Sequence, residues 1–79
     1  MRPLFKNDIR IYRAQYNLSQ DELAKKVGVR RETISNLEKG KYNPSLLLAM
    51  DIASVFNVNV ESIFQKLDKK ENIDYGPNV

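Results

Sequence analysis

Six side chains with strong hydrogen-bonding chemistry occupy residues 30–36, the segment "RRETISN". They are Arg30, Arg31, Glu32, Thr33, Ser35 and Asn36. An arginine guanidinium or an asparagine amide can form two parallel hydrogen bonds with a planar partner, such as the edge of guanine or adenine. A glutamate can accept from the cytosine amino group, and short hydroxyl side chains can bond to bases or phosphates. The segment therefore has the chemistry to bind the polar edge of a planar ligand.

The same segment has helical spacing with a thin apolar face. On a helical wheel, Ile34 and Leu37 share a narrow stripe. The opposite side carries polar residues: Glu32, Ser35, Asn36 and Lys39. A small protein has few residues with which to build a core, so a helix with so few apolar residues indicates that its polar side has a function. We therefore predict a helix from about Arg30 to Gly40 whose polar side is the functional surface.

Composition disfavours an enzyme. The chain has 79 residues, so it is one domain at most, and it contains neither cysteine nor histidine. Their absence removes disulfides, thiolate metal sites and the commonest general base. The acidic residues Asp8, Asp21 and Glu22 lie near predicted helix starts, where they are capping charges rather than a catalytic pair. We therefore predict no catalytic residue, no metal site and no cofactor.

Positive charge is concentrated in the first half of the chain. Residues 1–41 contain ten lysines and arginines against five acidic residues, whereas residues 42–79 contain three against five, for a net charge of +3. A basic half suits a polyanionic partner. A solvated basic face explains the charge equally well, so charge alone does not decide between the two.

No feature of the sequence predicts a membrane segment. No apolar run approaches the roughly 20 residues of a membrane span, and the start "MRPLFKND" lacks the apolar region of a signal peptide. With 29% charged and 42% hydrophobic residues, the composition is typical of a globular protein. We expect a soluble cytoplasmic protein with no membrane partner.

Capping signals predict two helices before the polar segment. Asn7 is a suitable N-cap for the first helix, and Asn17 can end it in the left-handed conformation. Ser19 and Glu22 form a capping-box pattern at the start of the second, and Gly28 can end that helix. Two short helices joined by a tight glycine-containing turn are typical of a helix-turn-helix, whose second helix enters the DNA major groove.

Residues 45–67 predict two further helices. Ser45 can cap a fourth helix, and a fifth covers residues 60–67. The apolar stripe of the fourth helix consists of Leu46, Ala49, Ile52, Ala53 and Phe56. The predicted fold class is all-α, with residues 1–67 as the DNA-binding domain and residues 68–79 as a C-terminal tail or arm. Ile73 and Tyr75 alternate around Asp74, a pattern that also allows a short terminal β-hairpin with Leu4–Phe5.

Residues 18–64, "LSQDELAKKVGVRRETISNLEKGKYNPSLLLAMDIASVFNVNVESIF", resemble the xenobiotic-response-element-type helix-turn-helix regulators, which include phage repressor and Cro proteins. The elements "LSQDELA", "VGV", "TISNLEKGK" and "NPSL" occur in the order and spacing of that family, and the match extends from about Ile9 to Phe64. The resemblance implies a compact single-domain member, a five-helix bundle of the phage repressor type. Its second and third helices would form the DNA-binding unit.

The resemblance also implies two sets of DNA-binding residues. Those facing or lying near base edges are Arg30, Arg31, Glu32, Thr33, Ser35 and Asn36. Those on the phosphate backbone are Ser19, Gln20, Lys39, Lys41, Tyr42, Asn43 and Ser45. Arg30 departs from the family pattern, in which Ser or Thr caps this helix. Because arginine cannot cap, the departure leaves the helix start open and favours a DNA role for Arg30.

Glu38 is an acidic residue that the helical wheel places beside the core. A buried carboxylate needs a partner, and the resemblance suggests Arg13 of the first helix. We therefore expect Glu38 to have a structural rather than a functional role.

Two functional hypotheses follow. The leading one is a sequence-specific transcriptional regulator, a homodimeric repressor that places the third helix in the major groove of a palindromic operator in double-stranded DNA. Candidate dimer contacts, for which a core role is an open alternative, are Leu47, Leu48, Val60, Ile63 and Leu67. The alternative is an antitoxin or other protein-interaction module with the same fold, in which residues 68–79 bind a protein partner.

Overall fold

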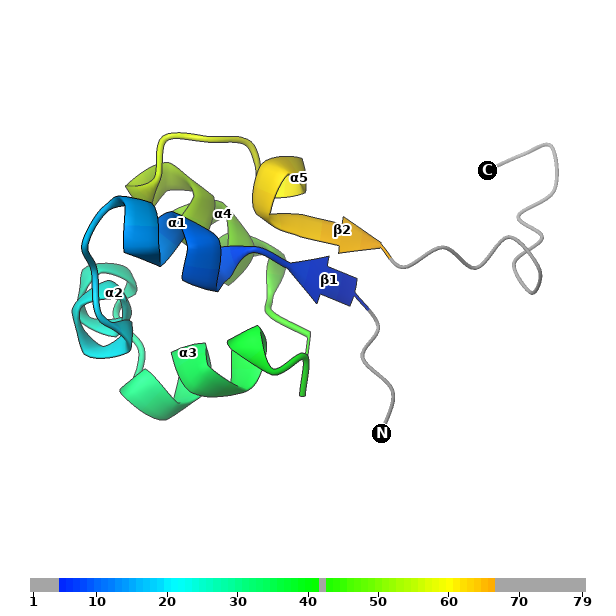
Figure 1. The fold of residues 1–79 in the computed structure, drawn as a ribbon. Helices are drawn as coiled ribbons and strands as arrows, with labels where there is room; N and C mark the ends of the chain where they lie inside the picture. Colours follow the sequence, from blue (N-terminus) through cyan, green and yellow to red (C-terminus); the bar gives the residue numbers. More distant parts are fainter. Residues whose placement is uncertain (1–4, 42, 67–79) are drawn as a thin grey trace, which may run out of the picture.

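The computed structural model describes residues 5–41 and 43–66 and confirms a mainly helical fold with a small terminal sheet (Figure 1). In chain order the elements are β1 (Phe5–Asn7), α1 (Ile9–Gln15), α2 (Gln20–Val27), α3 (Arg31–Glu38), α4 (Leu46–Val55), α5 (Val60–Ile63) and β2 (Phe64–Lys66). α2 packs against both α3 and α4, and α4 packs against α5. Within the described ranges, no helix combines the length and the apolar character that crossing a bilayer requires.

The predicted capping signals set the ends of α1 and α2. Asn17 adopts a positive φ of 55° just after α1. At the start of α2, the Ser19 hydroxyl accepts from the Glu22 N–H at 3.0 Å, and Glu22 Oε1 accepts from the Ser19 N–H at 2.8 Å. This capping box satisfies two N–H groups that the first turn of a helix would otherwise leave unpaired.

Hydrogen bonds from Ser19 hold the pKa of the exposed Glu22 carboxyl below its ordinary value. The backbone N–H of Ser19 has the larger effect and the Ser19 hydroxyl has the smaller one. A carboxyl with a lowered pKa in the folded state stabilises the fold at neutral pH. That contribution is lost as pH falls through the lowered pKa, because protonation weakens the charge-assisted bond.

The helix start predicted at Asn7 lies one residue later, because the N-cap of α1 is Asp8. Asn7 still contributes there, since its Oδ1 accepts from the Ile9 N–H at 3.2 Å. Its amide also donates to the Leu37 carbonyl at 2.9 Å, which connects the start of α1 to the end of α3. Asn7 therefore acts in tertiary packing as well as in local capping.

The prediction of a fifth helix over residues 60–67 was wrong at Phe64–Lys66, and Leu67 lies outside the described residues. Phe64–Lys66 form β2, which pairs antiparallel with β1 so that Phe5 faces Lys66 and Asn7 faces Phe64. The Asp8 N–H donates to the Ile63 carbonyl at 2.9 Å, and the rings of Phe5 and Phe64 pack edge to face at 5.7 Å. Pairing with β1 thus outweighs continuation of a four-residue helix, which is a weak unit by itself. The strand that we predicted at residues 73–75 lies outside the described residues.

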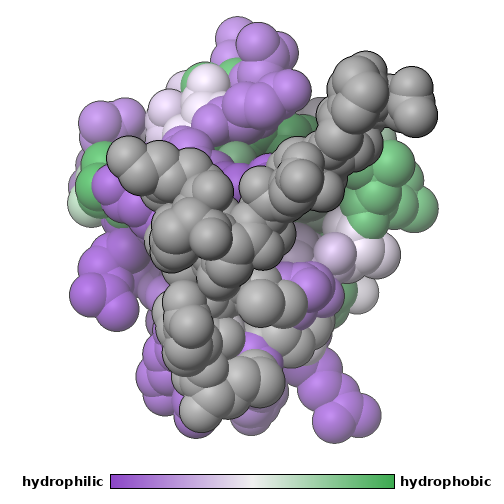
Figure 2. All heavy atoms as spheres, turned by 90° about the vertical axis from the view of Figure 1, so that its right-hand side faces the viewer, coloured by the Kyte–Doolittle hydropathy of each residue, from purple (hydrophilic) through white to green (hydrophobic). Residues whose placement is uncertain are grey.

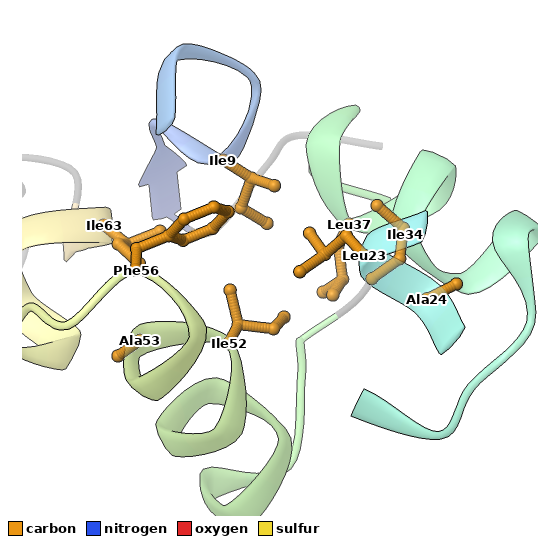
Figure 3. Close-up of a cluster of buried hydrophobic side chains, with 9 residues drawn as sticks. All are labelled: Ile9, Leu23, Ala24, Ile34, Leu37, Ile52, Ala53, Phe56 and Ile63. Atoms are coloured by element: carbon orange, nitrogen blue, oxygen red, sulfur yellow. The ribbon is translucent and has the colours of Figure 1, made fainter. Parts of the chain in front are cut away.

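A single apolar core joins the five helices (Figure 3). Its buried members are Ile9, Leu23, Ala24, Ile34, Leu37, Ile52, Ala53, Phe56 and Ile63. The apolar stripe predicted for α4 is buried from Ala49 onward, but Leu46 is 74% exposed. Leu46 is the first residue of α4, and it borders an open groove beside Phe5 and Phe64 instead of entering the core.

The turn between α2 and α3 depends on Gly28, which has φ +76° at the C-cap of α2. A Cβ added there would meet no atom within 4 Å, so any cost of substitution is conformational. We expect Gly28→Ala to lower the free energy of unfolding by about 1–2 kcal/mol, the typical cost of a left-handed non-glycine residue. Denaturant unfolding measures this change.

Gly28→Asn is the matched control, because asparagine tolerates the left-handed conformation and should lose less stability. Equal stability of Gly28→Ala and the wild-type protein would show that the left-handed turn is not required.

Candidate nucleic-acid interface

Within residues 5–41 and 43–66, α3 presents a polar surface that no other helix or strand covers. In Figure 1 it lies along the lower edge of the molecule, with no labelled element on its outer side. Ile34 and Leu37 are fully buried, whereas Arg30, Arg31 and Glu32 are exposed. Thr33, Ser35 and Asn36 are half-buried. The six predicted base-contact residues are therefore all on or adjoining one accessible helix.

Arg30 occupies the N-cap position of α3 with an extended backbone, φ −81° and ψ 155°. Its side chain makes no capping hydrogen bond. The expectation that arginine cannot cap is thus confirmed, and the helix begins at Arg31. An α-helix leaves its first N–H groups without intrahelical acceptors, so this end can receive polar atoms of a ligand.

The turn from α2 to α3 is tight. Beyond Gly28, the Val29 N–H donates back to the Ala24 carbonyl at 3.0 Å, which closes the end of α2. Val29 is half-buried against the core, between the two helices. The two helices therefore form the predicted helix-turn-helix, and the orientation of α3 is fixed by backbone bonds as well as by side-chain packing.

A buried carboxylate joins α3 to α1. The Glu38 side chain is only 2% exposed, and Arg13 donates to both of its oxygens, from Nε to Oε2 at 2.6 Å and from Nη2 to Oε1 at 3.2 Å. Arg13 Nη1 also donates to the Leu18 carbonyl at 3.0 Å. Two parallel bonds between a guanidinium and a carboxylate give strong and directional pairing. The predicted Arg13–Glu38 pair is confirmed.

Gln20 extends this cluster to the start of α3. Its Nε2 donates to Glu38 Oε1 at 3.0 Å, and its Oε1 accepts from Arg31 Nη1 at 3.4 Å. The second bond is long and exposed, so it orients Arg31 weakly. Neither contact was predicted from the sequence, because they join residues that are 18 and 11 positions apart.

The described residues predicted to contact phosphate lie at the start of α2 and after the end of α3. Lys39, Lys41 and Asn43 are exposed after it, and Gln20 is half-buried at the start of α2. Ser19 and Ser45 are exposed, but each hydroxyl accepts a capping bond, from Glu22 and Leu48 respectively. A hydroxyl that accepts one bond can still donate its proton to a phosphate oxygen. Tyr42 lies outside the described residues.

The comparisons with known proteins identify the same architecture. A family model described as helix-turn-helix matches residues 9–63. A protein of Archaeoglobus fulgidus, described as an uncharacterized HTH-type transcriptional regulator, is 68% identical over 56 residues, which are 71% of this chain and 80% of that protein.

Two solved structures are also similar. The restriction-modification controller protein C.AhdI from Aeromonas hydrophila has a TM-score of 0.62 and 28% identity, over 67% of this chain and 77% of its own. The clp gene regulator ClgR from Corynebacterium glutamicum has a TM-score of 0.64 and 26% identity, over 68% of this chain. This chain spans only 57% of the ClgR chain.

We expect Arg13→Ala to lower the free energy of unfolding by about 3 kcal/mol, because it leaves the buried Glu38 carboxylate without its guanidinium partner. Thermal and denaturant unfolding measure the loss. The double substitution Arg13→Met with Glu38→Leu is the control, because it leaves no unpaired charge and should recover most of the stability. An unchanged stability of Arg13→Ala would contradict a structural role for the pair.

Proposed function

This chain belongs to the helix-turn-helix family of Cro/C1-type DNA-binding transcription regulators, and we propose that it is a sequence-specific repressor that binds a palindromic operator as a homodimer. The observation that carries the proposal is the exposed polar side of α3, held in place by the buried Glu38 cluster. Rigid support matters because base readout requires side chains to be positioned before they meet the DNA. Bound in the cytoplasm at a promoter, the protein would exclude polymerase.

α3 enters the major groove in this proposal, with its N-terminal residues against base edges. Arg31 reads guanine through paired hydrogen bonds, and Asn36 reads adenine in the same way. Arg30, Thr33 and Ser35 contact bases or adjoining phosphates. Glu32 is acidic and repels phosphate, so its place is against a cytosine amino group. Sequence preference then arises from the few side chains that touch base edges.

Phosphate contacts from both ends of the unit fix the depth and angle of α3. Gln20 and Ser19 contact one strand, and the exposed residues after α3 contact the other: Lys39, Lys41, Asn43 and Ser45, together with Tyr42. Such contacts position the protein without sequence preference. Residues 1–67 form the DNA-binding domain in this proposal, and residues 68–79 form an arm beyond it.

In this proposal, dimerisation provides a second α3 helix, which reads the second half-site of the operator. Two α3 helices related by a twofold axis would read half-sites about 34 Å apart. Among the candidate contacts, Leu47 is 68% exposed, and Leu48 and Val60 are half-buried. Ile63 is fully buried in the core and is withdrawn from the set. Leu67 lies outside the described residues.

The exposed apolar residues of α4 support this assignment. Three apolar side chains on the first two turns of α4 are exposed: Leu46 at 74%, Leu47 at 68% and Met50 at 48%. Figure 2 shows a group of hydrophobic atoms exposed at the right-hand edge of the face that it views. Exposed apolar area on a small protein favours association. No observation on the described residues favours an antitoxin role over this one.

A selection of duplexes from a random pool by the purified protein tests the proposed function. We expect a palindromic winner that binds at least about a thousandfold tighter than a scrambled duplex. Equal binding to both duplexes, with steep salt dependence, would mean attraction to phosphate alone and would contradict a repressor that reads bases.

Base readout predicts different behaviour for two kinds of variant. Arg31→Ala and Asn36→Ala should each reduce discrimination against a substituted base pair by about 1–3 kcal/mol while the fold is kept. Gln20→Ala should instead weaken binding to all duplexes to a similar extent. Competition binding against single-substitution duplexes measures both effects. Unchanged base preference of Arg31→Ala and Asn36→Ala would contradict their assignment.

The dimer predicts that Leu47→Glu shifts the protein towards monomer, because it places a charge in an apolar interface. Sedimentation equilibrium over a concentration series measures the shift. Ile11→Glu is the matched control, since Ile11 of α1 is also exposed, at 55%, but lies outside the proposed contact. An identical association constant for Leu47→Glu and Ile11→Glu would exclude Leu47 from the interface.

A further inference from the structure

Arg10 of α1 lies beside the Glu38 cluster, which consists of Glu38, Arg13 and Gln20, and makes only a long ion-pair contact with it. Its Nε is 3.8 Å from Glu38 Oε1, which is too long for a hydrogen bond, and its side chain is 76% exposed. Arg13, on the same helix, is 15% exposed and uses its Nε and both terminal nitrogens in hydrogen bonds. The two arginines therefore have different roles, and Arg10 keeps its donors available to a ligand.

Two arginines of α1 approach the buried carboxylate of Glu38. Arg13 already neutralises Glu38 through two bonds, and Arg31 is connected to the same cluster through Gln20. Arg10 adds a third guanidinium. Asp8 lines the same small hollow as Arg10 and Glu38, about 250 Å³ in volume, yet it forms no ion pair with Arg10 among the described residues. Arg13 and Arg10 thus both approach the single carboxylate of Glu38, at 2.6 and 3.8 Å, and the Arg10 charge is solvent-accessible.

Arg10 and Gln20 approach the same atom. Glu38 Oε1 is 3.8 Å from Arg10 Nε and 3.0 Å from Gln20 Nε2, so these two nitrogens lie close together in space although α1 and α2 carry them. A phosphate that reaches Gln20 at the start of α2 would come within reach of the flexible, exposed Arg10 side chain. A guanidinium can bind a phosphate through two parallel hydrogen bonds.

We propose that Arg10 is an additional DNA-phosphate contact, supplied by α1 beside the helix-turn-helix unit, and that it binds the phosphate of the strand that Gln20 approaches. This inference rests on the proposed function, because it assumes that Gln20 faces the DNA backbone. In the free protein, the long contact to Glu38 keeps Arg10 near its binding position. On the DNA, Arg10 turns its terminal nitrogens to the phosphate, and Arg13 continues to neutralise Glu38.

The test measures binding of wild-type protein and Arg10→Gln to the selected operator and to a scrambled duplex between 50 and 200 mM salt. Each arginine–phosphate contact contributes about 0.9 to the slope of log K against log salt concentration. We expect Arg10→Gln to reduce the slope by about that amount. Its Kd should rise by a similar factor on both duplexes, and the difference from wild type should shrink roughly threefold across this salt range.

Two variants serve as matched controls. Lys26→Gln removes one positive charge from an exposed position at the far end of α2, and it should leave the slope unchanged. Arg10→Lys keeps the charge and should keep most of the slope. Because Arg10 is exposed, Arg10→Gln should shift the Tm by no more than about 3 °C, which thermal unfolding checks.

The outcomes separate the two claims. A slope for Arg10→Gln equal to that of Lys26→Gln, while the wild-type protein still prefers its operator, would overturn the Arg10 contact alone. A large fall in Tm with an unchanged slope would do the same, because Arg10 would then serve only Glu38. A wild-type protein that binds neither duplex would overturn both the contact and the proposed repressor.

Discussion

The buried carboxylate of Glu38 is the interaction on which the arrangement of this protein depends. A charge that is 2% exposed is tolerated only with close partners, and Glu38 obtains them from Arg13 of α1 and Gln20 of α2. These contacts join three helices that are too short to be stable by themselves. This polar cluster thus helps to hold the helices together, as a larger apolar core would in a longer chain.

The same cluster explains how α3 can be so polar. Only Ile34 and Leu37 of this helix are buried, and the remaining turns would be poorly held by two aliphatic side chains. Glu38 and the Asn7 bond to the Leu37 carbonyl secure its C-terminal end, and the Gly28 turn sets its N-terminal end. The side chains on the outer side of α3 are therefore not needed to hold the helix in place, so they are available to bind bases.

The local features of the fold could be predicted from the sequence, because capping and turn chemistry act over a few residues. Examples are the capping box of Ser19 and Glu22 and the left-handed conformations of Gly28 and Asn17, which the structure has as predicted. The Arg13–Glu38 pair followed from the family resemblance. The Gln20–Arg31 contact, the β2 strand at Phe64–Lys66 and the exposure of Leu46 were not predictable, because each depends on elements distant in the sequence. The base contacts proposed for α3 are made with a second molecule, and local sequence signals such as caps and turns do not specify them.

Chemical-shift mapping of the DNA interface tests whether α3 is the surface that reads DNA. Protein labelled with ¹⁵N would be titrated with the operator duplex, and the backbone amide shifts followed through the described residues. We expect the largest changes at Gln20 and along α3 from Arg31 to Lys39, with little change at the C-terminal half of α4. Changes concentrated on α4 and α5, with α3 unaffected, would show that α3 is not the surface that reads DNA.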